Sequence, residues 1–291
     1  MLIKFIKIIL TNPLKCISYI VIRFLKLNST QKRLFYSKYL NKKFFFISFD
    51  CDTQEDINCL ERLLQKLKDI KIKTILAIPA ELIENNIDLI VRLKNQYSIE
   101  FLNHGYYIHT LFNKKTRKYT SIFSYNQKNI EFIKKDIYLA DQVFKEKLNI
   151  NVRGFRAPHF GEVNLIKKIQ IFKYLRKLNY KYSSSSIYDL AYFFGPIFKF
   201  FEINEFTVTG IYKKEYRMLD SWSFLENVNK VKLLNVYFDE LRKLKNIFTS
   251  SKLNFINIYA DPSHIIDSEE FFKIISSFSI YNIMSFEEIK I

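Results

Sequence analysis

The chain has 291 residues, of which 48% are hydrophobic and 17% aromatic, so it can bury a substantial core and does not have the composition of a disordered protein. Its net charge of +17 comes from 36 Lys and only 10 Arg, which argues against nucleic-acid recognition because groove and phosphate readout favours Arg. Three cysteines are too few for a disulfide framework and indicate a reducing compartment.

The positive charge is concentrated at the N-terminus, where residues 1–49 contain ten Lys or Arg and no Asp or Glu. Over residues 1–27 the charges recur near the helical period, and Asn12-Pro13 interrupts the pattern, so two short amphipathic helices are predicted. Their charge-free runs fall short of the roughly 20 residues that cross a bilayer, and no signal-peptide cleavage site follows. We expect residues 1–42 to form a basic extension, with residues 1–28 lying on an anionic membrane surface on the cytoplasmic side. The alternative is a helical extension packed on the body of the protein with its lysines in water.

From residue 43 to residue 291 strand-like and helix-like segments alternate, which predicts a single α/β domain. Strands are predicted at 43–49, 73–78, 98–102, 152–156, 181–185, 203–208, 254–260 and 281–285. Helices are predicted at 55–69, 80–94, 128–148, 163–178, 229–248 and 268–277. This alternation is typical of a parallel sheet, most economically closed into a (β/α) barrel. Residues 105–127 show no period and are predicted to form a long loop over the site.

Two carboxylates end the first predicted strand. Asp50 and Asp52 are two residues apart, so in extended backbone both side chains leave the same face and can converge on one ion or one water. The alternative is a solvated turn, since Asp is common where strands end. Cys51 between them is either a soft metal ligand or, more in keeping with a free cysteine, a small buried apolar residue.

All four histidines of the chain also follow predicted strands. They are His104 and His109 after the third strand, His159 close to Arg156 after the fourth, and His264 close to Asp261 after the seventh. In a β/α barrel the carboxyl ends of the strands share one rim, so these side chains are expected in one pocket. Two histidines and a carboxylate with an open position make a common hydrolytic metal site.

These motifs resemble those of the polysaccharide deacetylases, the metal hydrolases of carbohydrate esterase family four. In the order of the family, the similar segments are Phe49-Asp50-Cys51-Asp52, Asn103-His104-Gly105-Tyr106 with His109, Phe155-Arg156-Ala157-Pro158, Leu219-Asp220-Ser221-Trp222 and Ile258-Tyr259-Ala260-Asp261-Pro262-Ser263-His264. The resemblance covers about residues 44–285. It implies a distorted (β/α) barrel that holds a divalent metal, usually zinc.

The resemblance also implies roles for single residues. Asp52, His104 and His109 would hold the metal, and Asp50 would take a proton from the attacking water. Arg156 would pair with Asp50 and keep it ionised, although it also suits a purely structural ion pair.

The remaining implied roles concern the substrate and the leaving group. The backbone N–H that follows Pro158, on His159, would stabilise the oxyanion, and Trp222 would wall the acetyl pocket. The His159 side chain stands where the family has an aromatic residue, and we expect it to contact substrate; the alternative is a further acid/base group. Either His264 or Asp261 would protonate the leaving amine; we favour His264, tuned by Asp220. By themselves, Asp220 and Trp222 equally suit a helix cap and a core aromatic.

One departure from the family concerns the metal ligands. The family's histidines are usually four residues apart, whereas His104 and His109 are five apart, which turns them by about 140° on a regular helix. Both can bind one metal only if the segment is irregular, and Gly105 makes that plausible.

Two functions follow from this sequence. The first is a metal-dependent hydrolase that removes an N-acetyl group from an amino sugar in a cell-surface polysaccharide or its lipid-linked precursor. The alternative is a catalytically degenerate protein of this fold that acts as a sugar-binding or scaffold module. A nucleic-acid partner would rest on charge alone and is not expected.

Overall fold

The computed structural model describes residue 40 and residues 42–113, 115–116, 118–160, 163–186, 191–210, 218–227, 230–250 and 253–289. The predicted extension, residues 1–42, lies almost entirely outside these residues. Among the described helices, none combines the length and the hydrophobicity that a membrane span requires.

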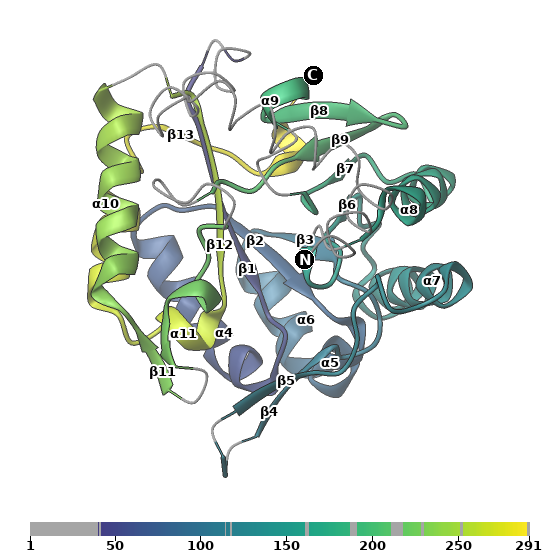
Figure 1. The fold of residues 1–291 in the computed structure, drawn as a ribbon. Helices are drawn as coiled ribbons and strands as arrows, with labels where there is room; N and C mark the ends of the chain where they lie inside the picture. The colour runs from purple at the N-terminus through teal and green to yellow at the C-terminus, as the bar shows by residue number, and fades with distance from the viewer. Residues whose placement is uncertain are drawn as a thin grey trace, which may run out of the picture.

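A largely parallel sheet forms the centre of the described protein (Figure 1). Its strands follow the order β12-β1-β2-β3-β6-β7-β9-β8, and β13 also pairs with β1. Their bounds are β1 (Phe44–Asp50), β2 (Thr74–Ile78), β3 (Ile99–Asn103), β6 (Gly154–Phe155), β7 (Tyr182–Ser183), β8 (Ile197–Phe200), β9 (Ile203–Phe206), β12 (Phe255–Ala260) and β13 (Asn282–Ile283). Each of the eight predicted strands overlaps one of these, and β8, which runs antiparallel to β9, was not predicted.

The segment that follows β9 returns to β12, the edge strand at the other side of the sheet. The N–H of Thr209 donates to the backbone oxygen of Asn257 on β12 at 2.7 Å. The side-chain amide of Asn257 donates in turn to the backbone oxygens of Phe206 and Thr207. These contacts close the sheet where strand pairing ends, so the predicted distorted (β/α) barrel is confirmed.

Strand β1 shows how the sequence assigns residues to the two sides of this barrel. Phe45, Ile47 and Phe49 belong to the apolar layer that the outer helices share, whereas Phe46 belongs to a separate cluster inside the barrel. Because side chains alternate along a strand, Ser48 and Asp50 follow Phe46 on the inner side. The barrel interior therefore changes from apolar to polar towards the carboxyl end of β1.

Helices surround the sheet, with α10 at the left of Figure 1 and α7 and α8 at the right. Their bounds are α4 (Gln54–Asp69), α5 (Ala80–Asn85), α6 (Ile87–Gln96), α7 (Ile130–Leu148), α8 (Leu165–Lys177), α9 (Ala191–Phe194), α10 (Asn235–Ser250), α11 (Pro262–Ile265) and α12 (Glu269–Ser276), with 3-10 turns η3 (Trp222–Phe224) and η4 (Phe286–Glu288). Helix α4 begins at Gln54, two residues after Asp52, because the N-cap residue Thr53 forms a capping box with Asp56.

Two predicted helices differ from the structure. The predicted helix 80–94 is two helices, which meet at Asn86. The predicted helix 229–248 begins only at Asn235, because strand β11 (Lys230–Leu233) precedes it and pairs with β10 (Leu225–Asn227).

The prediction of a long loop over residues 105–127 was wrong in part. Strands β4 (Thr110–Asn113) and β5 (Lys118–Ser121) pair antiparallel and form a hairpin that leaves the barrel rim, at the bottom of Figure 1. Its apolar residues are partly exposed, with Leu111 52% and Ile122, just beyond it, 51% accessible. In a short two-stranded hairpin with so little burial, apolar and polar residues need not alternate along the sequence, so the strands are hard to predict.

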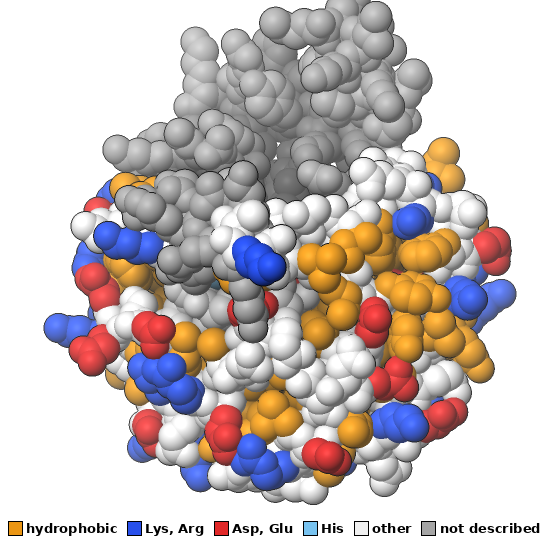
Figure 2. All heavy atoms as spheres, turned by 90° about the horizontal axis from the view of Figure 1, so that it is seen from below, with side chains coloured by type: hydrophobic (Ala, Val, Ile, Leu, Met, Phe, Trp, Pro, Cys, Tyr) orange, Lys and Arg blue, Asp and Glu red, His pale blue; other side chains and the backbone are white. Residues whose placement is uncertain are grey.

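The described surface carries both charge signs. Figure 2 shows Lys and Arg side chains interspersed with Asp and Glu on one face, with hydrophobic side chains gathered at the right of the view. Several of the exposed charges pair, as Arg62 does with Asp267 and Arg176 with Glu202. This mixture agrees with a basic excess that the sequence places mainly in residues 1–49.

Candidate metal centre and active site

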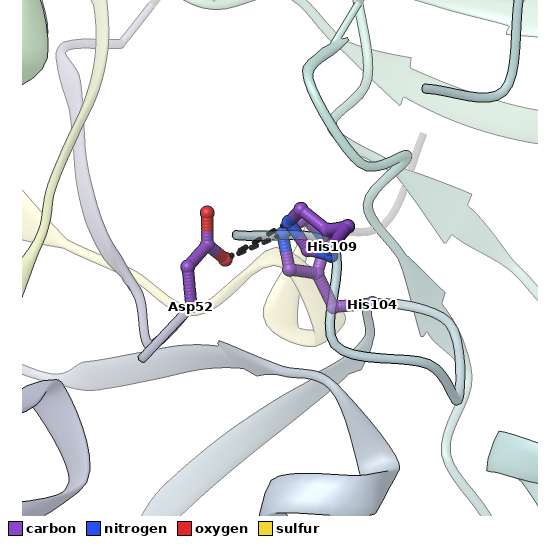
Figure 3. Close-up of side chains that lie close together, drawn as sticks. All are labelled: Asp52, His104 and His109. Atoms are coloured by element: carbon purple, nitrogen blue, oxygen red, sulfur yellow. Dashed lines mark ion pairs between the residues drawn. The ribbon is translucent and has the colours of Figure 1, made fainter. Parts of the chain in front are cut away.

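Three buried side chains converge at the carboxyl ends of β1 and β3. The Oδ1 atom of Asp52 lies 3.2 Å from Nε2 of His104 and 3.2 Å from Nε2 of His109, as Figure 3 shows. One ligand atom from each residue lies within 4.8 Å of the other two. The irregular segment between the histidines therefore brings both rings to one point despite their five-residue spacing.

The donor set fits a divalent metal. Oδ1 of Asp52 and both ring nitrogens of His109 are buried without a hydrogen-bond partner, which is costly, and an ion would satisfy Oδ1 and the Nε2 that faces it. Nδ1 of His104 lies 2.7 Å from the backbone oxygen of Arg156, to which it donates in the tautomer that leaves Nε2 free for a metal. Cys51 is excluded from this group, because its side chain lies in the apolar layer outside the barrel.

Asp50 lies beside this group but has a different partner. Its Oδ1 accepts a hydrogen bond of 2.6 Å from Nη1 of Arg156, whose side chain is completely buried inside the barrel. Nη2 of Arg156 donates to the hydroxyls of Ser48 and Ser184 at 2.7 and 3.2 Å. These hydroxyls come from β1 and from the end of β7, so the barrel wall fixes the guanidinium and, through it, Asp50.

Burial and neighbouring charges act in opposite directions on the acids of the site. Burial raises the pKa of Asp50 above its ordinary value; Arg156 acts in the predicted direction, but burial outweighs it. Burial also raises the pKa of Asp52, yet His109 and His104 reverse this and hold it well below the ordinary range. Asp52 thus stays ionised, as a ligand must, whereas Asp50 is better suited to accept a proton.

A cavity of about 490 Å³ opens beside these groups. Asp50, Asp52 and His104 line its floor. Apart from Met218, the remaining lining residues are polar or aromatic: Thr110, Tyr119, Ser121, Ser124, Gln127, His159, Phe160, Asp220, Trp222, Ser223 and Tyr259. The structure therefore brings together six of the predicted site residues in one cavity.

His159 lines the cavity from a tight turn. Its φ is +54°, and the N–H of Phe160 donates to the oxygen of Ala157, so Pro158 and His159 occupy the two central positions. This is the geometry of a type II turn, in which the second central residue has a positive φ. Nε2 of His159 lies 2.9 Å from the hydroxyl of Ser121, and burial lowers the pKa of His159 to about 4.

His264 and Asp261 lie behind the cavity wall and do not line it. Nδ1 of His264 lies 2.9 Å from the Ser221 hydroxyl, and Nε2 lies 3.0 Å from the Tyr119 hydroxyl. Burial lowers the pKa of His264 to about 3, so it is neutral near pH 7. Oδ2 of Asp261 lies 3.8 Å from Nδ1 of His264, and burial raises the pKa of Asp261 well above its ordinary range.

Asp220 and Trp222 both reach the cavity. Asp220 accepts hydrogen bonds from the N–H and the hydroxyl of Ser223, so it also holds the 3-10 turn η3, whose N-cap residue is Ser221. Burial raises the pKa of Asp220 to about 6. The expected contact to His264 is made instead by the neighbouring Ser221. The Trp222 ring packs edge-on against Tyr119 and His264 at 4.3 and 5.1 Å between centroids.

Two further groups escaped the sequence analysis. The hairpin contributes Thr110, Tyr119 and Ser121 to the cavity, and the polar, tyrosine-rich composition of residues 105–127 was the available signal. The Ser48 hydroxyl accepts a hydrogen bond from Arg156. The signal for Ser48 in the sequence was that it is the one hydroxyl side chain in a strand that is apolar up to Asp50.

Solved structures share this arrangement of strands and helices. A Mycobacterium smegmatis protein assigned as a polysaccharide deacetylase superposes with a TM-score of 0.62 at 14% identity, over 84% of this chain and 86% of that one. The chain has the polysaccharide deacetylase fold. The family resemblance predicted from the motifs is therefore confirmed at the level of the fold.

Two more solved structures show how broadly this fold is used. PuuE allantoinase gives a TM-score of 0.55 at 10% identity, over 81% of this chain and 82% of that one. A CE4 family pseudoenzyme from Bacillus anthracis gives 0.50 at 13% identity, over 83% of this chain and 63% of that one. No protein-family model and no curated protein matches the sequence.

Proposed function

We propose that the protein is a metal-dependent hydrolase that removes an N-acetyl group from an amino sugar. The observation that carries this proposal is the buried group of Asp52, His104 and His109, which lies beside the Asp50–Arg156 pair and opens onto a polar cavity. A metal held there, zinc by preference, would polarise the acyl carbonyl and lower the pKa of water.

Asp50 accepts the proton of the attacking water in this proposal. Its pKa is raised by burial, which makes it a stronger base than an exposed carboxylate. Arg156 holds the carboxylate in one orientation through the 2.6 Å hydrogen bond. The water oxygen bonds to the acyl carbon, the C–N bond breaks, and the leaving nitrogen takes a proton, so that acetate and a free amine result.

The proton for the leaving amine passes through His264 and Asp261 in this proposal. Asp261, whose pKa burial raises, is the group that keeps an acidic proton, and the neutral His264 and the Tyr119 hydroxyl would connect it to the cavity. The N–H of His159, in the turn after Pro158, is the proposed oxyanion donor, and Trp222 is the proposed wall for the acetyl methyl.

The cavity lining supports an uncharged sugar. Hydroxyl and amide groups of Thr110, Ser121, Ser124, Gln127 and Ser223 suit hydrogen bonds to sugar hydroxyls. The described lining contains carboxylates but no Lys or Arg, which disfavours an anionic group next to the scissile bond. We place the substrate in a cell-surface polysaccharide or its lipid-linked precursor, reached from the cytoplasmic face of the membrane.

The second candidate is a sugar-binding protein that has lost turnover. It is favoured by the position of His264, which does not line the cavity and whose ring nitrogens both already have hydroxyl partners, and by the likeness to a pseudoenzyme.

Acetate release from N-acetylglucosamine oligomers by the zinc-loaded protein tests the two candidates. Asp50→Asn serves as the matched inactive control. Zinc-dependent release that Asp50→Asn abolishes would support the hydrolase, and oligomer binding without release would support the binding module. Allantoin is the comparison substrate, because an allantoinase shares the fold; its hydrolysis in place of acetate release would overturn the sugar assignment.

A further inference from the structure

The four residues between the two histidines form a non-helical loop, and helices on both sides hold it by hydrogen bonds. Gly105 begins it with a φ of +80°, a conformation that disfavours other residues. Asn103 Oδ1 accepts the N–H of Gly105 at 2.9 Å. The loop is thereby turned away from a helical path directly after His104.

Asp136 on helix α7 holds the middle of this loop. Its Oδ1 accepts the backbone N–H groups of both Tyr106 and Tyr107 at 2.9 Å each, and its Oδ2 accepts the hydroxyl of Tyr125 at 2.6 Å. Asp136 is fully buried. A Cβ atom on Gly105 would lie 2.3 Å from Oδ2 of Asp136, so the glycine also makes room for the carboxylate.

Helix α5 holds the other side of the loop. The N–H groups of Ala80 and Glu81 donate to the backbone oxygens of Gly105 and Tyr106 at 3.0 and 2.9 Å. The Glu81 carboxylate accepts the N–H of Ile108 at 3.0 Å. The loop is thus held from both sides, but Asp136 is the group that binds two consecutive N–H donors at its centre.

We propose that Asp136 is a positioning residue for the second histidine of the metal centre. It fixes the peptide groups that join Gly105 to Tyr106 and Tyr106 to Tyr107, and so sets the direction in which His109 leaves the loop. This explains how a five-residue spacing brings both Nε2 atoms within 3.2 Å of Asp52 Oδ1. The inference rests on the metal site of the proposed function.

Removing the carboxylate should loosen the loop without touching a ligand. Asp136→Ala leaves two N–H groups in a buried place without an acceptor, so the loop can keep its shape only at a free-energy cost. Partners of metal ligands typically change metal affinity by about 10- to 100-fold when they are removed. Asp136→Asn keeps an oxygen of the same reach and should restore most of the affinity.

Cobalt binding by the full chain tests the proposal. Co²⁺ is titrated into wild type, Asp136→Ala and Asp136→Asn, with its visible absorption reporting affinity and coordination. Hydrogen exchange of the Tyr106 and Tyr107 amides is measured on the metal-free proteins. Glu240→Ala is the matched control, because Glu240 is also a buried helical carboxylate but lies on α10.

We expect Asp136→Ala to bind Co²⁺ at least about tenfold more weakly, with an altered spectrum and faster exchange of both amides. Asp136→Asn and Glu240→Ala should stay close to wild type. Wild-type affinity, spectrum and exchange in a folded Asp136→Ala would overturn the positioning role. If Asp136→Ala does not fold, Tyr125→Phe replaces it, since it removes the hydroxyl that Oδ2 of Asp136 accepts. We then expect Tyr125→Phe to bind Co²⁺ several-fold more weakly. Unchanged Co²⁺ binding by Tyr125→Phe would overturn the positioning role. A wild-type chain that binds no Co²⁺ would overturn the metal site itself, and this role with it.

Discussion

Asp50 and Asp52 are separated by one residue, yet their surroundings give them different tasks. Asp52 faces two histidine nitrogens that hold its pKa low, and Asp50 faces a buried arginine. Sequence spacing alone predicted that both could converge on one ion or water. It could not divide the roles, because the division depends on Arg156, which lies 106 residues further along the chain.

We expect Asp52→Ala, His104→Ala and His109→Ala each to abolish zinc retention, because each removes one of the three converging ligand atoms. The effect of His109→Ala should equal that of His104→Ala. Zinc content is measured after gel filtration in chelator-free buffer. His159→Ala is the control, since His159 lines the same cavity without belonging to the ligand group. Full zinc content in His109→Ala would show that another residue completes the site.

Asp50→Asn should keep zinc and lose turnover by roughly 10²- to 10⁴-fold, because a base contributes proton transfer and no ligand atom. Acetate release and zinc content are measured on the same sample. The role assignment would be reversed if Asp50→Asn lost the metal while Asp52→Ala retained it.

The elements were more predictable than the contacts between them. Buried parallel strands such as β1 are continuous apolar runs, which sequence shows clearly. The β4–β5 hairpin was missed because its stability comes from few contacts, such as Phe112 against Tyr119 at 4.6 Å. The loop that Asp136 holds was expected only as an irregularity, since its shape is imposed by two helices distant in sequence.

Tyr119 connects the β4–β5 hairpin to α11 through a hydrogen bond, and we expect this bond to affect turnover. Its hydroxyl lies 3.0 Å from Nε2 of His264, so Tyr119→Phe leaves a buried ring nitrogen without a partner. We expect about fivefold slower acetate release with unchanged zinc affinity, for a loss of about 1 kcal/mol at this contact. The control is Tyr281→Phe. It also removes a tyrosine hydroxyl, which is bonded to Thr249, and neither residue lines the cavity. Unchanged kcat in Tyr119→Phe would show that the tie has no part in catalysis.

At the scale of the whole molecule, a half-buried acid at the start of β3 makes stability depend on pH. Burial raises the pKa of Glu100 from 4.5 to about 7. Between these values the unfolded chain has lost its proton and the folded chain has kept it, so Glu100 lowers stability as pH rises from about 4.5 to 7. The full effect is about 3 kcal/mol.

Glu100→Gln should remove this dependence. We expect the variant and wild type to unfold at similar urea concentrations near pH 4.5, and the variant to be more stable by up to about 3 kcal/mol at pH 8. The difference between the two proteins isolates Glu100 from other titrating groups. Glu146→Gln, at an exposed position, should show no such divergence. A constant difference between Glu100→Gln and wild type from pH 4.5 to 8 would contradict the prediction.

The distribution of charge along the chain gives the last prediction. Residues 1–28 contain five basic residues and no acid, and the barrel that follows has its own closed sheet and core. Each Lys or Arg near an anionic bilayer contributes about 1 kcal/mol, which salt weakens. Deleting residues 1–28 should therefore leave a folded, zinc-binding protein that no longer sediments with phosphatidylserine vesicles.

Two controls make this test specific to charge. A full-length chain with Lys4, Lys7, Lys15, Arg23 and Lys26 replaced by Gln should also lose binding, and wild type should bind less in high salt and to neutral phosphatidylcholine. If only the deletion lost binding, the apolar residues of the segment would carry the attachment, since burial of apolar surface is insensitive to screening. If the truncated protein still bound vesicles as wild type does, the attachment would lie on the barrel and the proposed role of the N-terminus would fall.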